Sequence, residues 1–162
     1  PNVVGSDGHP ALVTAAREGS ANALDALLAA GAKVDARSGY GDTALMLAAL
    51  NGRLEIAKKL RAKGAALDYP GWTPLIYAAT GGHDEVVKFL LGEGAKIDAT
   101  SPNGTSALMM ATREGKFATA ELLIARGADV NHRNADGASA LTWAERNDDK
   151  ILVERLKRAG AK

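Results

Sequence analysis

Cysteine is absent from all 162 residues of the chain. Its absence excludes disulfide bonds, a thiol nucleophile and any zinc or iron–sulfur site built on thiolates. Aromatic residues are scarce, at 4%, although hydrophobic residues make up 46%. The apolar content is therefore mostly Ala and Leu, which favours thin, closely packed helices over a wide β-sandwich core. Because the chain also lacks an apolar run of about eighteen residues, we expect no membrane-spanning helix.

Excess charge of either sign is lacking as well. Twenty Lys and Arg residues oppose nineteen Asp and Glu residues, for a formal net charge of +1. The arginines alternate with acidic residues, as in Arg113-Glu114, and form no continuous cationic stripe. We therefore expect neither nucleic acid nor an anionic membrane as a partner.

The chain does contain an internal repeat, which is the most informative feature of the sequence. Steps of 33, 30, 33 and 33 residues separate five key leucines: Leu12, Leu45, Leu75, Leu108 and Leu141. A Gly-Ala pair follows each leucine nineteen residues later, at Gly31, Gly64, Gly94, Gly127 and Gly160. Two separate landmarks keep one register through five copies, so chance does not explain the pattern.

Each copy predicts two short helices joined by turns. A hydroxyl side chain stands at the predicted N-cap of the first helix in four copies, at Thr43, Thr73, Ser106 and Ser139. A glycine then ends that helix, at Gly19, Gly52, Gly82 and Gly115, whereas the fifth copy has Asp148 there. A second amphipathic stretch runs to the Gly-Ala pair. Neither helix can bury its apolar face alone, so stability must come from stacking of neighbouring copies.

Thr43-Ala-Leu-Met-Leu-Ala-Ala and Thr73-Pro-Leu-Ile-Tyr-Ala-Ala resemble the Thr-Pro-Leu-His-x-Ala-Ala motif of the ankyrin repeat. The resemblance runs from about Pro10 to the C-terminus. It implies an all-α fold with short β-hairpin turns, a solenoid of helix–turn–helix–hairpin units. We expect a single ankyrin-repeat domain over residues 1–162, with repeats at about 5–37, 38–68, 69–100, 101–133 and 134–162. The first and last repeats are expected to act as caps.

The chain departs from the family pattern in its first-helix motif and in the length of one hairpin. The family's His, which braces the hairpin turns, is replaced by Met46, Ile76, Met109 and Thr142, so turn rigidity must come from other residues. The third unit is also three residues short, and the loss falls in its hairpin, Asp68-Tyr-Pro-Gly-Trp72. This hairpin is the least repetitive segment of the array.

Motifs that could carry chemistry are weak. Gly39-Tyr-Gly-Asp-Thr-Ala matches a dinucleotide-binding fingerprint in letters, but it lies in a hairpin and not between a strand and a long helix. The three histidines, His9, His83 and His132, lack metal-ligand spacing, and Asn103-Gly-Thr reads as a hairpin turn rather than a glycosylation site. We therefore expect no enzyme activity, no catalytic residue, no metal and no cofactor.

The resemblance implies that a partner binds in a concave groove lined by hairpin tips and first helices. Carried over position by position, this groove contains Tyr40, Asp42, Tyr69, Trp72, Tyr77, Met110, Arg113, Glu114, Trp143 and Arg146. Both tryptophans and all three tyrosines of the chain are among them, and aromatic and Arg side chains dominate interface hot spots. The alternative is that Tyr77 and Trp143 only fill gaps between adjacent first helices.

The sequence thus predicts a non-catalytic, monomeric scaffold that binds a protein partner of unknown identity. A regulatory module of a longer chain is an alternative, and a small-ligand-binding protein or enzyme is a weaker one. Because the chain begins at Pro1 and not at Met, we expect a processed form or a piece of a longer protein. The compartment stays open between cytoplasm and periplasm. The Ala-, Gly- and Leu-rich composition favours a natural bacterial protein over an idealised design.

Overall fold

The computed structural model describes Val4 and residues 9–162. Within this part, ten helices follow one another in five consecutive pairs. The first helix of each pair is α1 (Ala11–Glu18), α3 (Ala44–Leu50), α5 (Pro74–Gly81), α7 (Ala107–Arg113) or α9 (Ala140–Arg146). The second is α2 (Ala21–Ala29), α4 (Leu54–Ala62), α6 (Asp84–Gly92), α8 (Phe117–Ala125) or α10 (Lys150–Arg158). The predicted start of the first repeat, at about residue 5, lies outside the described residues.

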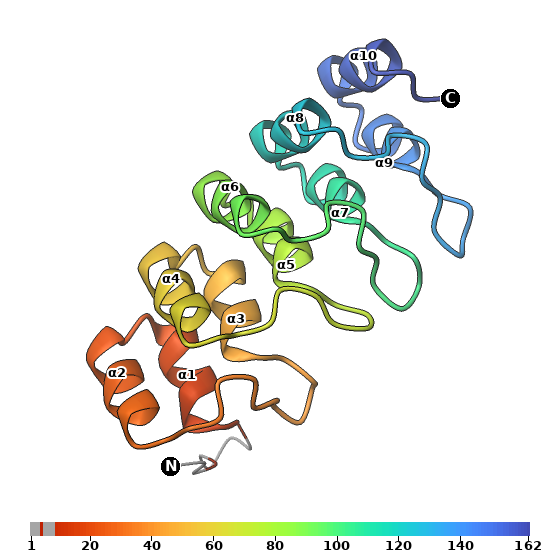
Figure 1. The fold of residues 1–162 in the computed structure, drawn as a ribbon. Helices are drawn as coiled ribbons and strands as arrows, with labels where there is room; N and C mark the ends of the chain where they lie inside the picture. Colours follow the sequence, from red (N-terminus) through yellow and green to blue (C-terminus); the bar gives the residue numbers. More distant parts are fainter. Residues whose placement is uncertain (1–3, 5–8) are drawn as a thin grey trace.

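The helix pairs stack side by side into an elongated array with its two termini at opposite ends (Figure 1). The first helices form one layer, in which α1 contacts α3, α3 contacts α5, α5 contacts α7 and α7 contacts α9. The second helices form the other layer, and the loops between pairs project beyond the first helices on the opposite side. This arrangement places the hairpin tips and the first helices on one face of the molecule.

The predicted N-cap residues precede the first helix in four of the five pairs. The hydroxyls of Thr43, Thr73, Ser106 and Ser139 each accept a hydrogen bond from the backbone amide three residues on, at 3.3 to 3.4 Å. Each hydroxyl thereby satisfies one of the amides that a helix start leaves without a partner. The first helix α1 instead begins after Pro10, without a side-chain cap. The four N-caps are confirmed.

Left-handed backbone ends the first helices, as the glycines predict. Gly82, for example, has φ of 77° and donates its amide to the carbonyls of the last turn of α5. In the fifth pair Asp148 takes this position with φ of 52° and is the one non-glycine residue of positive φ among the described residues. A non-glycine residue there is strained, although Asp tolerates it better than most.

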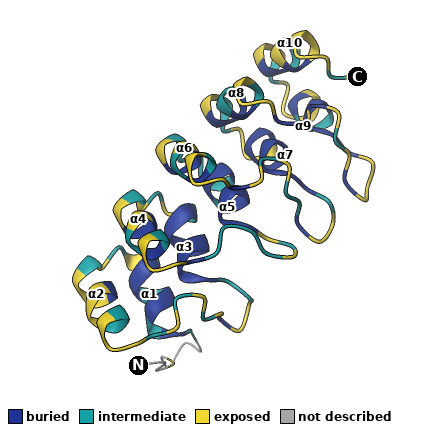
Figure 2. Ribbon diagram, viewed as in Figure 1, coloured by how far each residue is buried: buried dark blue, intermediate teal, exposed yellow. Residues whose placement is uncertain are grey.

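The core runs along the layer of first helices. Figure 2 shows these helices largely buried, whereas the second helices bury only the face turned toward them. The key leucines Leu12, Leu45, Leu75 and Leu108 are at most 2% exposed, and Leu141 in the last pair is 8% exposed. Alanines such as Ala48 and Ala79 are fully buried between them, and small residues let neighbouring helices approach closely.

The all-α repeat solenoid is confirmed. In the described part of the chain, strand structure is confined to two isolated bridges, Val4 with Pro10 and Thr100 with Ser106. In that same part no helix is long and apolar enough to cross a membrane.

Candidate functional site

On the face formed by the hairpin tips and first helices, three hairpins each contain one buried polar side chain that hydrogen-bonds to the hairpin's own backbone. The Ser38 hydroxyl accepts hydrogen bonds from the amides of Tyr40 and Asp42, both at 3.2 Å. In the last hairpin, Asn134 Oδ1 accepts from the amides of Asp136 and Ala138 at 3.1 and 2.9 Å. Ser101 accepts from the Thr105 amide at 3.1 Å in the hairpin between them. These hydrogen bonds hold the backbones of the three hairpins without a histidine in the helix motif.

The shortened third hairpin is held from outside, by the hairpin before it. The Tyr69 hydroxyl donates to Asp35 Oδ1 at 2.6 Å, and the Arg37 guanidinium lies 4.4 Å from the centre of the Tyr69 ring. Asp35 Oδ1 also accepts from the Ala66 amide at 3.1 Å. Tyr69 is therefore engaged by its own chain on two sides, and less of it remains for a partner than its groove position suggests.

The contact of Asp35 with Ala66 recurs along the array. One carboxylate or amide oxygen at the start of each hairpin accepts a backbone amide of the next repeat, at 2.9 to 3.3 Å: Asp35 from Ala66, Asp68 from Lys96, Asp98 from Asp129 and Asn131 from Lys162. These bonds fix successive hairpins relative to one another. A partner would therefore meet a preformed surface.

Two of the three histidines, His83 and His132, have structural roles. His83 Nε2 lies 2.9 Å from the Leu50 carbonyl, and His132 Nε2 lies 2.7 Å from the Gly104 carbonyl of the preceding hairpin. Both imidazoles tie one repeat to the one before it. Over the described residues, no group of three His, Cys, Asp or Glu side chains is placed to hold a metal ion.

Trp72, Tyr77 and Asp42 come together near the short hairpin. The rings of Trp72 and Tyr77 meet edge to face, with centroids 5.8 Å apart, and the Tyr77 hydroxyl donates to Asp42 Oδ1. Trp72 remains 40% exposed. Tyr40, at the tip of the preceding hairpin, is 85% exposed and lies 5.7 Å from the His9 ring, centroid to centroid. Together with Tyr69, five of the expected groove residues thus lie in the N-terminal half of the face.

Burial and hydrogen bonding also shift the pKa values of two tyrosines in this half. Burial raises the pKa of Tyr77 above its ordinary value of 10.0, and the hydrogen bond to the Asp42 carboxylate raises it further. Burial and the Asp35 carboxylate raise the pKa of Tyr69 in the same direction. Both hydroxyls therefore stay protonated at neutral pH and serve as hydrogen-bond donors.

Trp143, Arg113 and Arg146 form a second group in the C-terminal half. The guanidinium carbons lie 5.7 Å (Arg113) and 4.8 Å (Arg146) from the centre of the Trp143 ring system. Glu114 Oε1 lies 3.2 Å from Arg113 Nε. The structure thus brings four of the expected residues into one cluster, in which Arg113 and Arg146 lie against the indole and Glu114 pairs with Arg113.

Met110 is buried more deeply than the other residues expected to line the groove. Its side chain is 5% exposed and belongs to the core between first helices, so it offers little surface to a partner. Tyr77 and Trp143, at the same position of their repeats, are half-buried and pack against the core with part of each ring. The gap-filling role is therefore real for these two rings, although each keeps some exposed surface.

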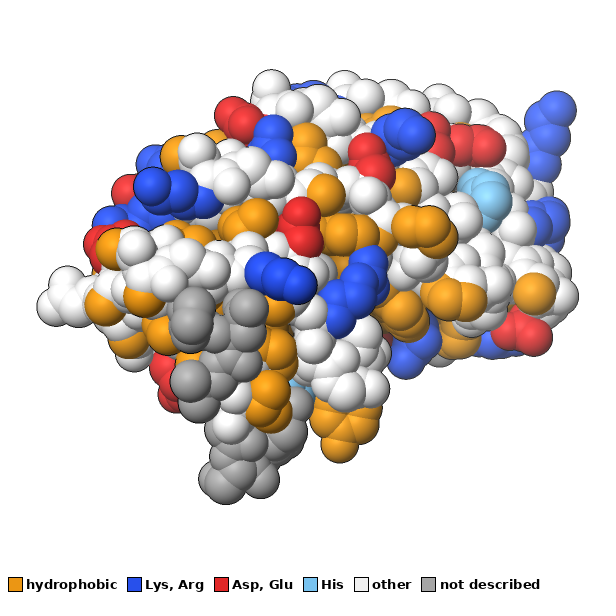
Figure 3. Space-filling view, turned by 60° about the horizontal axis from the view of Figure 1, so that its bottom comes forward, with side chains coloured by type: hydrophobic (Ala, Val, Ile, Leu, Met, Phe, Trp, Pro, Cys, Tyr) orange, Lys and Arg blue, Asp and Glu red, His pale blue; other side chains and the backbone are white. Residues whose placement is uncertain are grey.

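The exposed surface of this side is chemically mixed. With the hairpin side turned forward, Figure 3 shows hydrophobic side chains between positive and negative ones, and neither sign covers the face.

The sequence comparisons decide the family. A family model describing three copies of the ankyrin repeat matches residues 12–101, 64–134 and 93–162. The chain belongs to the ankyrin repeat family. A search of curated protein sequences finds no match to it. Ankyrin repeats are generally non-catalytic and act as protein–protein interaction modules.

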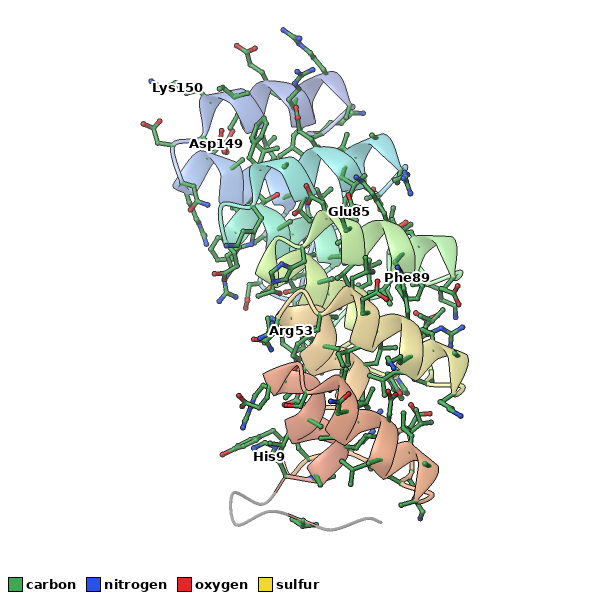
Figure 4. The ribbon with its side chains drawn as sticks, turned by 90° about the vertical axis from the view of Figure 1, so that its left-hand side faces the viewer. His9, Arg53, Glu85, Phe89, Asp149 and Lys150 are labelled. Atoms are coloured by element: carbon green, nitrogen blue, oxygen red, sulfur yellow. The ribbon has the colours of Figure 1, made fainter. Side chains whose placement is uncertain are left out.

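The opposite side of this ankyrin array is polar and carries exposed ion pairs. Lys59 lies 2.5 Å from Asp25, Arg61 lies 3.3 Å from Glu93 and Arg155 lies 2.9 Å from Glu121, and each pair joins neighbouring repeats on the second-helix side. Figure 4 views this side, with Glu85 and Phe89 of α6 labelled. Phe89 is half-buried against the core, as is Phe117 of α8, so neither phenylalanine is an exposed anchor.

Proposed function

We propose that this ankyrin array is a non-catalytic scaffold that binds one protein partner on the face formed by its hairpin tips and first helices. The observation that carries the proposal is the placement of the aromatic side chains. All five Tyr and Trp residues lie on that face, and Tyr40 and Trp72 are 85% and 40% exposed. Exposed aromatic rings on a rigid support bury large area for little loss of conformational freedom.

The rigidity of the face supports the proposal. The side-chain braces at Ser38, Ser101 and Asn134 hold the hairpin backbones, and the bonds from Asp35 and its equivalents hold each hairpin against the next repeat. A preformed surface lowers the ordering cost of association, so more of the contact energy remains as affinity. The mixed charge of the face favours a protein partner over a nucleic acid, which would require a continuous cationic surface.

The proposal treats residues 1–162 as one domain in which the first and last repeats act as caps. The unbroken series of contacts from α1 through α9 supports one continuous stack. On the last pair, charged residues such as Lys157 and Arg158 are exposed, which is the polar character expected of a capping repeat. The same proposal includes a monomeric state, which light scattering would test.

Photo-crosslinking tests the binding face. A benzophenone amino acid replaces Tyr40 in one variant and Ile151 in another, because Ile151 is 63% exposed on the opposite layer, in α10. In extracts of the source organism we expect a discrete protein adduct from position 40 and none from position 151. An adduct of the same protein at both positions, or at position 151 alone, would refute the proposed face.

A further inference from the structure

Trp143 carries a buried polar atom with no hydrogen-bond partner. Its indole Nε1 is shielded from solvent, and the described residues offer it no acceptor. A buried indole N–H usually finds a partner, and leaving it without one is unfavourable. The equivalent positions of the three preceding repeats hold Leu47, Tyr77 and Met110. Packing alone therefore does not require an indole at this position.

The two arginines give a reason for the indole. The guanidinium carbons of Arg113 and Arg146 lie 5.7 and 4.8 Å from the centre of its rings, within the range of a cation–π interaction. Among the aromatic side chains, Trp binds cations most strongly. An indole at position 143 therefore restrains two long side chains that would otherwise sample many rotamers. In this position its own N–H is left without a hydrogen-bond partner.

The charge of these arginines is only partly neutralised within the chain. Arg113 pairs with Glu114 at 3.2 Å, and their side chains are 49% and 37% exposed. Exposed pairs of this kind contribute little and are readily exchanged. Within the residues that the structure describes, Arg146 is exposed and is paired with no carboxylate. Both arginines are the last residues of their helices, where the helix dipole favours positive charge.

We propose that Trp143 is a platform that holds Arg113 and Arg146 ready for a carboxylate, and that the partner presents an acidic segment to this end of the groove. This inference rests on the proposed function and adds the chemistry of the partner. A guanidinium binds a carboxylate in two parallel hydrogen bonds when its plane is correctly oriented, and stacking on the indole fixes that plane. The Asp42 carboxylate, which lies beside Tyr77 in the N-terminal half of the face, repels an acidic segment. The segment is therefore placed over the fourth and fifth repeats.

The test is an NMR titration of the full chain with a short acidic peptide, acetyl-(Glu)4-amide, and with acetyl-(Lys)4-amide for comparison. The chain has only two tryptophans, so its two indole N–H signals are assigned with one Trp72→Phe variant. We expect saturable shifts of the Trp143 indole and of the Arg113 and Arg146 Nε–H signals with the acidic peptide alone. The Trp72 indole signal should not move. Equal shifts with the lysine peptide, or none with either, would refute the inference.

Matched variants separate the site from general charge attraction. Arg146→Gln and Arg126→Gln each remove one positive charge. Arg126 is an exposed residue at the C-terminal end of α8, outside the proposed site. We expect Arg146→Gln to weaken peptide binding about tenfold, in the range of one lost charge-assisted pair, and Arg126→Gln to leave it unchanged. Equal loss in the two variants would show that no built site exists.

A Trp143→Phe variant tests the platform itself, because both arginines remain. Peptide binding should weaken about threefold, because phenylalanine binds cations less strongly than indole. Thermal stability should be retained, since the N–H without a partner is also removed. Unchanged binding in a folded variant would refute the platform role. If the crosslinker at position 40 captures a partner but the acidic peptide does not bind, this inference fails and the proposed function stands.

Discussion

The two sides of the array join their repeats in different ways. On the hairpin side, buried first helices meet, and buried or half-buried polar groups such as Asn134 and His83 bond across or within repeats. On the opposite side, the second helices are joined by exposed ion pairs such as Lys59 with Asp25. Buried contacts are costly to break, whereas exposed pairs are not. The contacts that are costly to break therefore lie in the core between the two helix layers and in the hairpins, beneath the exposed rings of Tyr40 and Trp72.

The largest loss of stability is expected from a substitution in the buried core, here in a first helix. Leu108 is 1% exposed in α7, so Leu108→Ala should lower the free energy of unfolding by about 3 kcal/mol. Ile151→Ala, at an exposed site of α10, should change it by less than about 0.5 kcal/mol. Urea denaturation measures both. Similar losses in the two variants would contradict the assignment of stability to the buried core.

Removal of a hairpin brace should have an intermediate effect. Asn134→Ala leaves the amides of Asp136 and Ala138 without their acceptor. We expect a loss of about 1–2 kcal/mol in the free energy of unfolding, the cost of a buried donor without a partner. Hydrogen exchange should accelerate at the Ala138 amide and remain slow at Thr105, whose brace is Ser101. Unchanged exchange at Ala138 would show that the brace is dispensable.

Alkaline pH should weaken the hairpin side specifically. The pKa values of Tyr69 and Tyr77 are raised above 10.0 in the folded chain, so both tyrosines ionise first in the unfolded state. Their contribution to stability is complete below pH 10 and falls as the pH rises toward the folded pKa values. The fall should stay below about 1.4 kcal/mol per pH unit for each partly exposed tyrosine.

Phenylalanine variants isolate this effect. The Tyr69→Phe, Tyr77→Phe double variant should lose less stability between about pH 10 and pH 11.5 than the parent chain, because its rings cannot ionise. Chemical denaturation at each pH supplies the free energies of unfolding. Parallel pH profiles for the two proteins would exclude the tyrosines as the cause.

The smallest effect is expected on the ion-paired side. Lys59→Ala removes an exposed pair with Asp25, so the free energy of unfolding should change by less than about 1 kcal/mol. A double-mutant cycle with Asp25→Ala isolates the pair, and its coupling should shrink further in high salt. A coupling energy above about 2 kcal/mol would place this side among the determinants of stability.

The repeating part of the molecule could be predicted from the sequence. Leucines, caps and glycines each have a local backbone role, so their register predicted the helices. The hairpin braces were missed, although a signal exists: Ser38, Ser101 and Asn134 each stand five residues before an N-cap. In the shortened hairpin that position holds Asp68, which bonds to the Lys96 amide of the next repeat instead.

The side-chain contacts of the candidate groove could not be predicted in the same way. Register places a residue on a face but does not determine its depth, as buried Met110 and half-buried Trp143 show at equivalent positions. The bond from Tyr69 to Asp35 joins residues 34 apart, and it depends on the path of a shortened loop. Contacts of this kind follow from side-chain rotamers and neighbouring loops, which no spacing encodes.

The most direct test of the central claim is the affinity of the captured partner for two matched variants. Trp72→Ala removes an exposed ring from the hairpin side, and Ile151→Ala removes an exposed side chain from the other layer. Calorimetry should show at least about tenfold weaker binding for Trp72→Ala, as for an interface hot spot, and unchanged binding for Ile151→Ala. Unchanged binding by Trp72→Ala together with a loss in Ile151→Ala would contradict the claim that the hairpin side is the binding surface.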